Sequence, residues 1–171
     1  MIIRPPSYEP IIGPLAFLGG PIQGARDWQH DAETIIESLS SFVNIANPRR
    51  TVTFHGDFAP ELYNEQVDWE SHHLARAGAF GVVMFWLEKE QVHRCDRAYA
   101  QTTRSELFEW KVRHKYEGAN VVVGIDEGYT GARYVRRRFG RECPRIPLCS
   151  SLEETCRVAV RLALDLEQKK K

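Results

Sequence analysis

The stretch Val82-Val83-Met84-Phe85-Trp86-Leu87 decides the fold, because it is the strongest strand signal in the chain. Its continuous run of apolar residues gives an extended strand two apolar faces. Strands of this kind lie at the centre of parallel sheets, where helices cover both faces. The stretch therefore predicts a buried central strand.

Apolar runs on both sides of this stretch predict four further strands, at residues 14–20, 42–46, 121–125 and 145–149. We expect the last one at a sheet edge, because Pro147 cannot donate to a ladder of hydrogen bonds. Between the strands, apolar residues recur at helical spacing, which predicts helices there. Alternating strands and helices indicate a three-layer α/β fold with a parallel sheet and right-handed crossovers. Such folds bind ligands at the carboxyl ends of the strands.

The composition indicates one globular domain over residues 1–171, with residues 1–13 as an irregular N-terminal arm. A chain of 171 residues that is 43% hydrophobic and 27% charged can bury one substantial core. The formal net charge is zero, so no overall field attracts nucleic acid or an anionic membrane. No segment has the apolar length of a membrane span or of a signal peptide. We therefore expect a cytoplasmic protein with neither nucleic acid nor membrane as partner.

Sequence motifs for common cofactors and metals are absent. In the turn Gly19–Gly24, Pro21 occupies the position where a dinucleotide-binding fingerprint needs its second glycine, and no phosphate-loop lysine follows. The four cysteines show no Cys-x-x-Cys pair and no zinc-ligand spacing. We therefore expect no cofactor and no metal. The glycine turn could hold a phosphate or a sugar hydroxyl through its N–H groups, or simply connect a strand to a helix.

Glu106 is the first candidate for a catalytic residue. It lies in the stretch Thr102–Trp110, which opens a helical pattern after the central strand and therefore belongs at the ligand-binding edge of the sheet. The start of a helix also stabilises negative charge. An alternative interpretation is structural, because Thr103 and Glu106 have the spacing of a capping box.

Other polar residues are expected at the same edge. Asn47, Arg49 and Arg50 follow the second strand, and an arginine there suits a planar or anionic partner, or simply pairs with a nearby acid. Glu70 shares a helical stripe with apolar residues that we expect to face the core, including Val67. An acid on such a stripe needs either a partner or a chemical task.

Two further segments invite a functional interpretation. The aromatic-rich stretch 51–63 is long enough to form a lid, and a helix capped by Asn64 is expected after it. The stretch 133–139 places arginines between aromatic residues, as some nucleic-acid sites do. In a neutral chain we interpret it as a solvated loop.

Five short motifs together resemble the nucleoside 2-deoxyribosyltransferase-like family over roughly residues 14–130. None is specific alone, but their order and spacing agree with that family. They are Phe17-Leu18-Gly19-Gly20-Pro21-Ile22, Asn47-Pro48-Arg49-Arg50, Glu65-Gln66-Val67-Asp68-Trp69-Glu70, Phe85-Trp86-Leu87, and Arg104-Ser105-Glu106-Leu107-Phe108-Glu109-Trp110. The resemblance implies a flavodoxin-like sheet of five parallel strands in the order 2-1-3-4-5.

The resemblance also implies an activity, namely glycosyl transfer or hydrolysis at the N-glycosidic bond of a 2′-deoxynucleoside or its 5′-monophosphate. Glu106 would be the nucleophile that forms a glycosyl ester, and Glu70 would orient the sugar or assist the leaving base. The protein would form a homodimer or a higher homo-oligomer. A substrate phosphate would need a cation near the glycine turn, with Arg26, Arg49 and Arg50 as candidates. The implied substrate-binding residues are Phe17, Gly20, Pro21, Gln23, Asn47, Arg49 and Trp69.

The sequence departs from the family pattern at three points. Phe17 replaces a tyrosine, the acid usually found before the central strand is missing from segment 78–81, and Glu106 precedes Leu107-Phe108 where the family has Leu-Gly. Two other functions therefore remain open. One is a catalytically inactive nucleotide-binding module of the same fold. The other is an interaction protein that docks through stretch 51–63.

Overall fold

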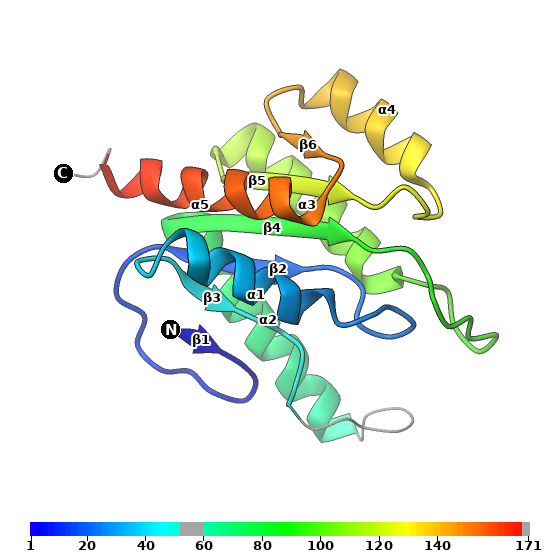
Figure 1. The fold of residues 1–171 in the computed structure, drawn as a ribbon. Helices are drawn as coiled ribbons and strands as arrows, with labels where there is room; N and C mark the ends of the chain where they lie inside the picture. Colours follow the sequence, from blue (N-terminus) through cyan, green and yellow to red (C-terminus); the bar gives the residue numbers. More distant parts are fainter. Residues whose placement is uncertain (52–59, 169–171) are drawn as a thin grey trace.

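The computed structural model describes residues 1–51 and 60–168, which fold around a six-stranded parallel sheet (Figure 1). The strands follow one another across the sheet in the order β1-β3-β2-β4-β5-β6. Along the chain the elements are β1 (Ile2–Ile3), β2 (Leu15–Gly19), α1 (Trp28–Leu39), β3 (Asn44–Ala46), α2 (Pro60–Phe80), β4 (Gly81–Leu87), α3 (Gln101–Glu117), β5 (Val121–Ile125), α4 (Ala132–Glu142), β6 (Leu148–Cys149) and α5 (Leu152–Gln168).

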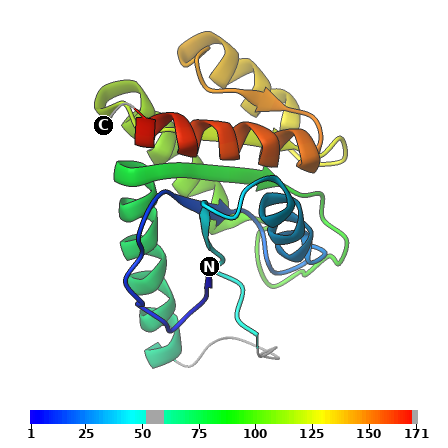
Figure 2. The same cartoon turned by 60° about the vertical axis from the view of Figure 1, so that its left-hand side comes forward.

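The sheet is the middle of three layers. Helices α1 and α5 cover one face, and α2 and α3 cover the other, as the two views show (Figures 1 and 2). Strand β4 runs through the centre with all seven of its residues buried. Its side chains alternate between two cores: Val83 and Phe85 pack on the α2 and α3 side, and Met84 and Trp86 pack on the α1 and α5 side. The prediction of a central strand covered on both faces is confirmed.

The five predicted strands are present in the predicted order, as β3-β2-β4-β5-β6. The sixth strand, β1, was not predicted. It lies within the N-terminal arm and pairs with β3 through Ile2 beside Ile45 and Ile3 beside Ala46. The arm is therefore not wholly irregular, and the count of five strands is wrong by one. Two residues are too few to show the alternation by which a strand is recognised in sequence.

Two other local predictions are wrong. Helix α2 begins at Pro60, not after Asn64, so the last four residues of the proposed lid 51–63 are helical. Residues 52–59 of that stretch lie outside the described residues. The basic stretch 133–139 belongs to helix α4, not to a loop, and buries Val135 and Phe139 against the core. Its arginines occupy other faces of the helix, which explains why the stretch shows no long apolar run.

Candidate active site

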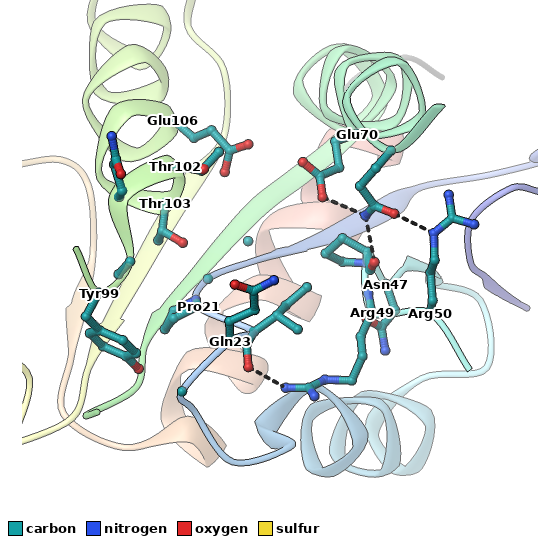
Figure 3. Close-up of a pocket in the computed structure, with 18 of the residues that line it drawn as sticks. Pro21, Gln23, Asn47, Arg49, Arg50, Glu70, Tyr99, Thr102, Thr103 and Glu106 are labelled. Carbon is teal, nitrogen blue, oxygen red and sulfur yellow. Dashed lines mark hydrogen bonds between the residues drawn. The ribbon is translucent and has the colours of Figure 1, made fainter. Parts of the chain in front are cut away.

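A cavity of about 940 Å3 opens at the carboxyl ends of β2, β3 and β4. The end of β2 contributes Phe17, and the glycine turn that follows it forms the floor between the two helical walls (Figure 3). One wall is the start of α3 with the loop before it. The other wall consists of α2 and the residues that follow β3. The volume suits a ligand the size of a nucleoside or nucleotide.

Glu70 and Glu106 face each other across this cavity (Figure 3). Helices α2 and α3 lie on the same face of the sheet, on either side of β4, so each presents a carboxylate toward the space between them. Two helices separated in sequence thus bring the two predicted acids together. No other residue described by the structure forms a hydrogen bond with the Glu106 carboxylate, which leaves its oxygens available to a ligand.

Glu106 lies in the second turn of α3 and does not complete a capping box. The helix begins at Gln101, and the residue before it, Ala100, has φ 55° and makes no side-chain capping bond. Thr103 is already the third residue of the helix, where it is 5% exposed and lines the cavity. The structural interpretation of the Thr103–Glu106 spacing is therefore wrong, and Glu106 has no capping role.

The surroundings of Glu106 favour its neutral form. Burial of the side chain raises the pKa of Glu106 to about 8, with smaller contributions from the negative charges of Glu70 and Glu109. The glutamate therefore keeps its proton in the free protein at neutral pH. Carboxyl groups with shifts of this size occur most often where acid–base or nucleophilic chemistry takes place.

A hydrogen-bonded bridge fixes Glu70. The Gln66 side-chain amide donates to a Glu70 carboxylate oxygen at 2.8 Å and to the Pro48 carbonyl at 2.8 Å. The Gln66 carbonyl oxygen accepts from Nε of Arg50 at 2.9 Å. Burial raises the pKa of Glu70, while the bond from Gln66 and the charge of Arg50 act in the opposite direction.

The helical stripe around Glu70 differs from the predicted one. Val67 is 40% exposed and borders the cavity, whereas Leu74 and Ala77 are buried in the core, as expected. Glu70 is only half-buried and lies on the cavity wall. The acid thus lies between the core face and the exposed face of α2. Its position on the cavity wall is compatible with a chemical task, one of the two explanations that the sequence left open.

The glycine turn after β2 is closely packed. A Cβ atom on Gly20 would lie 2.4 Å from the Trp86 carbonyl oxygen and 2.6 Å from the Trp28 ring, so only glycine fits. The Trp28 indole N–H donates to the Pro21 carbonyl at 2.9 Å and secures the turn from below. Gly20, Pro21 and Gln23 all line the cavity.

Asn47 and Arg49 line the cavity but are held by other protein groups. Asn47 is 2% exposed; its amide donates to Glu33 at 2.7 Å and its oxygen accepts from the Arg49 backbone N–H at 2.8 Å. The Arg49 side chain donates to Gln29 at 3.1 Å and to two backbone carbonyls. Burial lowers the pKa of Arg49, although nearby Asp27 opposes this effect.

Two predicted site residues do not line the cavity. Trp69 is fully buried, stacks on His73 with ring centroids 4.1 Å apart, and donates its indole N–H to the Ser7 carbonyl at 2.7 Å. It is a core residue that ties the N-terminal arm to α2. Arg26, a candidate for binding phosphate, instead forms ion pairs with Asp31 and with Glu88.

The structure adds Tyr99, which sequence reasoning missed, to the cavity, and it places Thr102 and Thr103 of the predicted stretch Thr102–Trp110 in the cavity wall. Tyr99, Thr102 and Thr103 line the wall below Glu106, and the Tyr99 hydroxyl donates to the Glu88 carbonyl at 2.8 Å (Figure 3). They belong to the loop after β4 and the start of α3. Because this segment follows the central strand at its carboxyl end, its position was a signal that could have identified Tyr99. The N-terminal arm contributes Arg4, for which the sequence carries no comparable signal.

Residues 1–51 and 60–168 hold no cluster of three His, Cys, Asp or Glu side chains suited to a metal ion. In the same part of the chain, no helix has the length and apolar character needed to cross a membrane.

A three-layer parallel α/β fold with two carboxylates across a cavity at its strand ends defines a class of proteins that bind small molecules at this edge. Within this class, the chain belongs to the family described as nucleoside 2-deoxyribosyltransferase like, whose model matches residues 14–129. The match includes Glu70 and Glu106 and ends before α4. It also leaves out the N-terminal arm. No curated protein matches the chain.

Proposed function

We propose that this protein cleaves the N-glycosidic bond of a 2′-deoxynucleoside or its 5′-monophosphate and passes the sugar to a second base or to water. The observation that carries this proposal is the pair formed by Glu70 and Glu106 across a cavity of nucleoside size. Family membership supports a nucleoside as the ligand. A binding module would gain nothing from two half-buried acids with raised pKa values, because both acids make the empty cavity less stable.

The chemistry follows from two carboxylates on opposite sides of a sugar. The ionised Glu106 carboxylate attacks C1′, a carbon–oxygen bond forms, and the carbon–nitrogen bond to the base breaks with its electron pair moving to the base. A proton from Glu70 neutralises the leaving base. In the second step a free base or water attacks C1′ and releases Glu106, while Glu70 takes up the proton of the incoming group.

The raised pKa of Glu106 is part of this mechanism. In the free protein the glutamate carries its proton below pH 8, so the proton must leave or pass to Glu70 before attack. Gln66 holds the Glu70 carboxyl in place by donating to one of its oxygens, which favours the ionised form of Glu70 in the free protein. The pair therefore titrates as a unit in which one proton and one charge are shared.

We further infer that the protein works as a homodimer or a higher homo-oligomer. Tyr63 and Val67 border the cavity from α2, and both are exposed apolar side chains. Contact with a second copy would remove them from water and narrow the cavity mouth. Sedimentation velocity measures the assembly, and a monomer at micromolar concentration would contradict this inference.

The proposed activity is tested with the four 2′-deoxynucleosides and their 5′-monophosphates, each with and without a second free base. Base release and base exchange are followed by chromatography beside a Glu106→Ala variant. We expect turnover by the wild-type protein alone, together with a glycosyl adduct on Glu106 in the intact-mass spectrum. Exchange that needs the added base defines a transferase, and release without it defines a hydrolase. Equal binding by both proteins without turnover would instead establish a catalytically inactive nucleotide-binding module.

A further inference from the structure

The N-terminal arm supplies one arginine to the cavity. Arg4 directly follows β1, and the pairing of β1 with β3 carries it to the edge of the cavity beside the residues that follow β3. The family model begins at residue 14, so Arg4 belongs to a segment that the family match does not contain. The family match therefore implies nothing about its contribution to the site.

A buried carboxylate fixes the position of Arg4. Glu33 on α1 is 3% exposed, and both of its oxygens accept from Nη2 of Arg4 at 2.6 Å. One of those oxygens also accepts from the Asn47 amide at 2.7 Å. Glu33 thus joins the arm, α1 and the residues after β3 into one polar cluster at the cavity wall.

Arg4 keeps donors that the protein does not use. Arg49 and Arg50, which line the same side of the cavity, donate through both Nε and a terminal nitrogen to protein groups. Arg4 donates only through Nη2 to described residues, and its side chain is 30% exposed. Its Nε and Nη1 groups are therefore available to a ligand in the cavity.

The direction of the proposed reaction indicates which part of the ligand lies near Arg4. A nucleophile displaces a leaving group from the opposite side of the reacting carbon, so the base must point away from Glu106. Asn47 lies on the Glu70 side of the cavity, across from Glu106 (Figure 3). Because Glu33 ties Arg4 to Asn47, Arg4 lies on the side where the base must be.

The charge of the cluster indicates the chemical group. Glu33 neutralises Arg4, so the pair offers hydrogen-bond donors without a net positive charge. An anionic phosphate would meet the Glu33 carboxylate as well as the guanidinium, which weakens the attraction. A neutral acceptor meets no such repulsion. Among nucleobases, guanine, hypoxanthine, cytosine and thymine carry a carbonyl oxygen, whereas adenine carries none.

We propose that Arg4 is a specificity-determining residue that donates a hydrogen bond to a carbonyl oxygen of the nucleobase, and that Glu33 is its positioning residue. The proposal rests on the proposed function, because the direction of the base follows from attack by Glu106. It deepens that function by naming a preference for bases with a carbonyl group over adenine.

The test compares 2′-deoxyinosine with 2′-deoxyadenosine, two purine nucleosides that differ at the carbonyl position. Dissociation constants are measured by calorimetry in a Glu106→Ala background, which removes turnover. We expect this protein to prefer deoxyinosine. Adding Arg4→Ala reduces the preference by about tenfold, the effect of losing a hydrogen bond from a charged donor. Adding Glu33→Gln also reduces it, because Arg4 is no longer held in place.

Arg76→Ala is the matched control. Nη2 of Arg76 donates to the Ile11 and Gly13 carbonyls at 3.3 and 3.0 Å, so it also anchors the arm, but it does not line the cavity. If Arg4 only anchors the arm, Arg4→Ala and Arg76→Ala should have the same effect on the preference for deoxyinosine over deoxyadenosine. That result, or an unchanged preference in Arg4→Ala, overturns the proposal.

The same experiment separates this proposal from the proposed function. Binding whose base preference depends on Arg4, in a protein whose wild-type form shows no turnover, supports the role of Arg4 and contradicts the enzymatic activity. Turnover by the wild-type protein, together with a base preference that stays unchanged in Arg4→Ala, contradicts only the role of Arg4. If neither nucleoside binds to any variant, both proposals fail.

Discussion

The carboxylate of Glu70 raises the pKa of Glu106 from across the cavity, so the two acids cannot ionise independently. Burial is the larger cause of the shift, and the Glu70 charge adds to it. A site of this kind stores an unfavourable interaction in the empty protein. A substrate that enters between the two acids separates the charges and changes which of them holds the proton.

The pH dependence of activity should report this pair. Attack requires an ionised Glu106 and departure of the base requires a protonated Glu70, so the active pair holds one proton. We therefore expect kcat/KM to fall as pH rises through about 8, where this last proton leaves. Glu70→Gln removes both the proton donor and the charge that raises the Glu106 pKa. Its maximum rate should be lower, and its activity should rise as Glu106 ionises and then stay level up to pH 9.5. Profiles between pH 5 and 9.5 with the same shape in both proteins would contradict this coupling.

The pH dependence of stability should report the same raised pKa of Glu106. The folded protein retains the Glu106 proton up to about pH 8, whereas the unfolded chain releases it near the ordinary value of 4.5. Folding therefore takes up a proton in this window, and stability falls as pH rises through it. Glu106→Gln removes this penalty, so its melting temperature should exceed that of the wild type by a margin that grows from pH 5 to pH 8. Glu127→Gln, which changes an exposed acid, should show no growing margin.

The glycine turn gives a test of packing. Gly20→Ala places a methyl group 2.4 Å from the Trp86 carbonyl and against the Trp28 ring, so backbone must move. We expect unfolding free energy to fall by about 1–3 kcal/mol and KM to rise, because the turn forms the cavity floor. Gly140→Ala in helix α4 is the control, since its Cβ meets no neighbour. It should stabilise the protein by up to about 1 kcal/mol. Equal effects on urea denaturation would refute the packing argument.

Trp69 gives a test of the corrected site. Trp69→Phe removes the indole N–H that binds the Ser7 carbonyl and leaves space in the core. The loss of one buried hydrogen bond and some packing should lower the unfolding free energy by about 1–3 kcal/mol. KM should stay unchanged below the melting transition, because the side chain does not line the cavity. A raised KM with unchanged stability would return Trp69 to the substrate-binding residues.

The sequence predicted those parts of the fold that long apolar runs encode. Strand β4 is apolar along its whole length, and its neighbours β2 and β5 are five residues each. Their positions could therefore be predicted from the runs of apolar residues in the sequence. Strand β1 has two residues, and only its pairing with Ile45 and Ala46 makes it a strand. That pairing depends on tertiary structure, which no local pattern contains.

The candidate site was predictable to the extent that strand ends define it. Glu106 and Asn47 follow strands that share an edge, and the structure places both in one cavity. Trp69 and Glu70 are neighbours in sequence, but successive residues of an α-helix point about 100° apart, so one enters the core and the other reaches the cavity. The prediction treated both as site residues because it had no independent measure of the helix orientation.

The short edge strand β1 has a consequence for how such a protein can diversify. It joins the sheet only through β3, at the margin farthest from β5 and β6. Side-chain changes in residues 1–13 that keep the backbone contacts with Trp69 and Arg76 can therefore accumulate without altering β2, β4 and β5, on which the helices that carry Glu70 and Glu106 pack. If Arg4 binds the base, replacing the side chain at position 4 would change which nucleoside is preferred. The step that breaks the glycosidic bond would stay the same. The reaction would then depend on one part of the chain, which contains Glu70 and Glu106. The base preference would depend on another part, the arm 1–13, so the two could change separately in evolution.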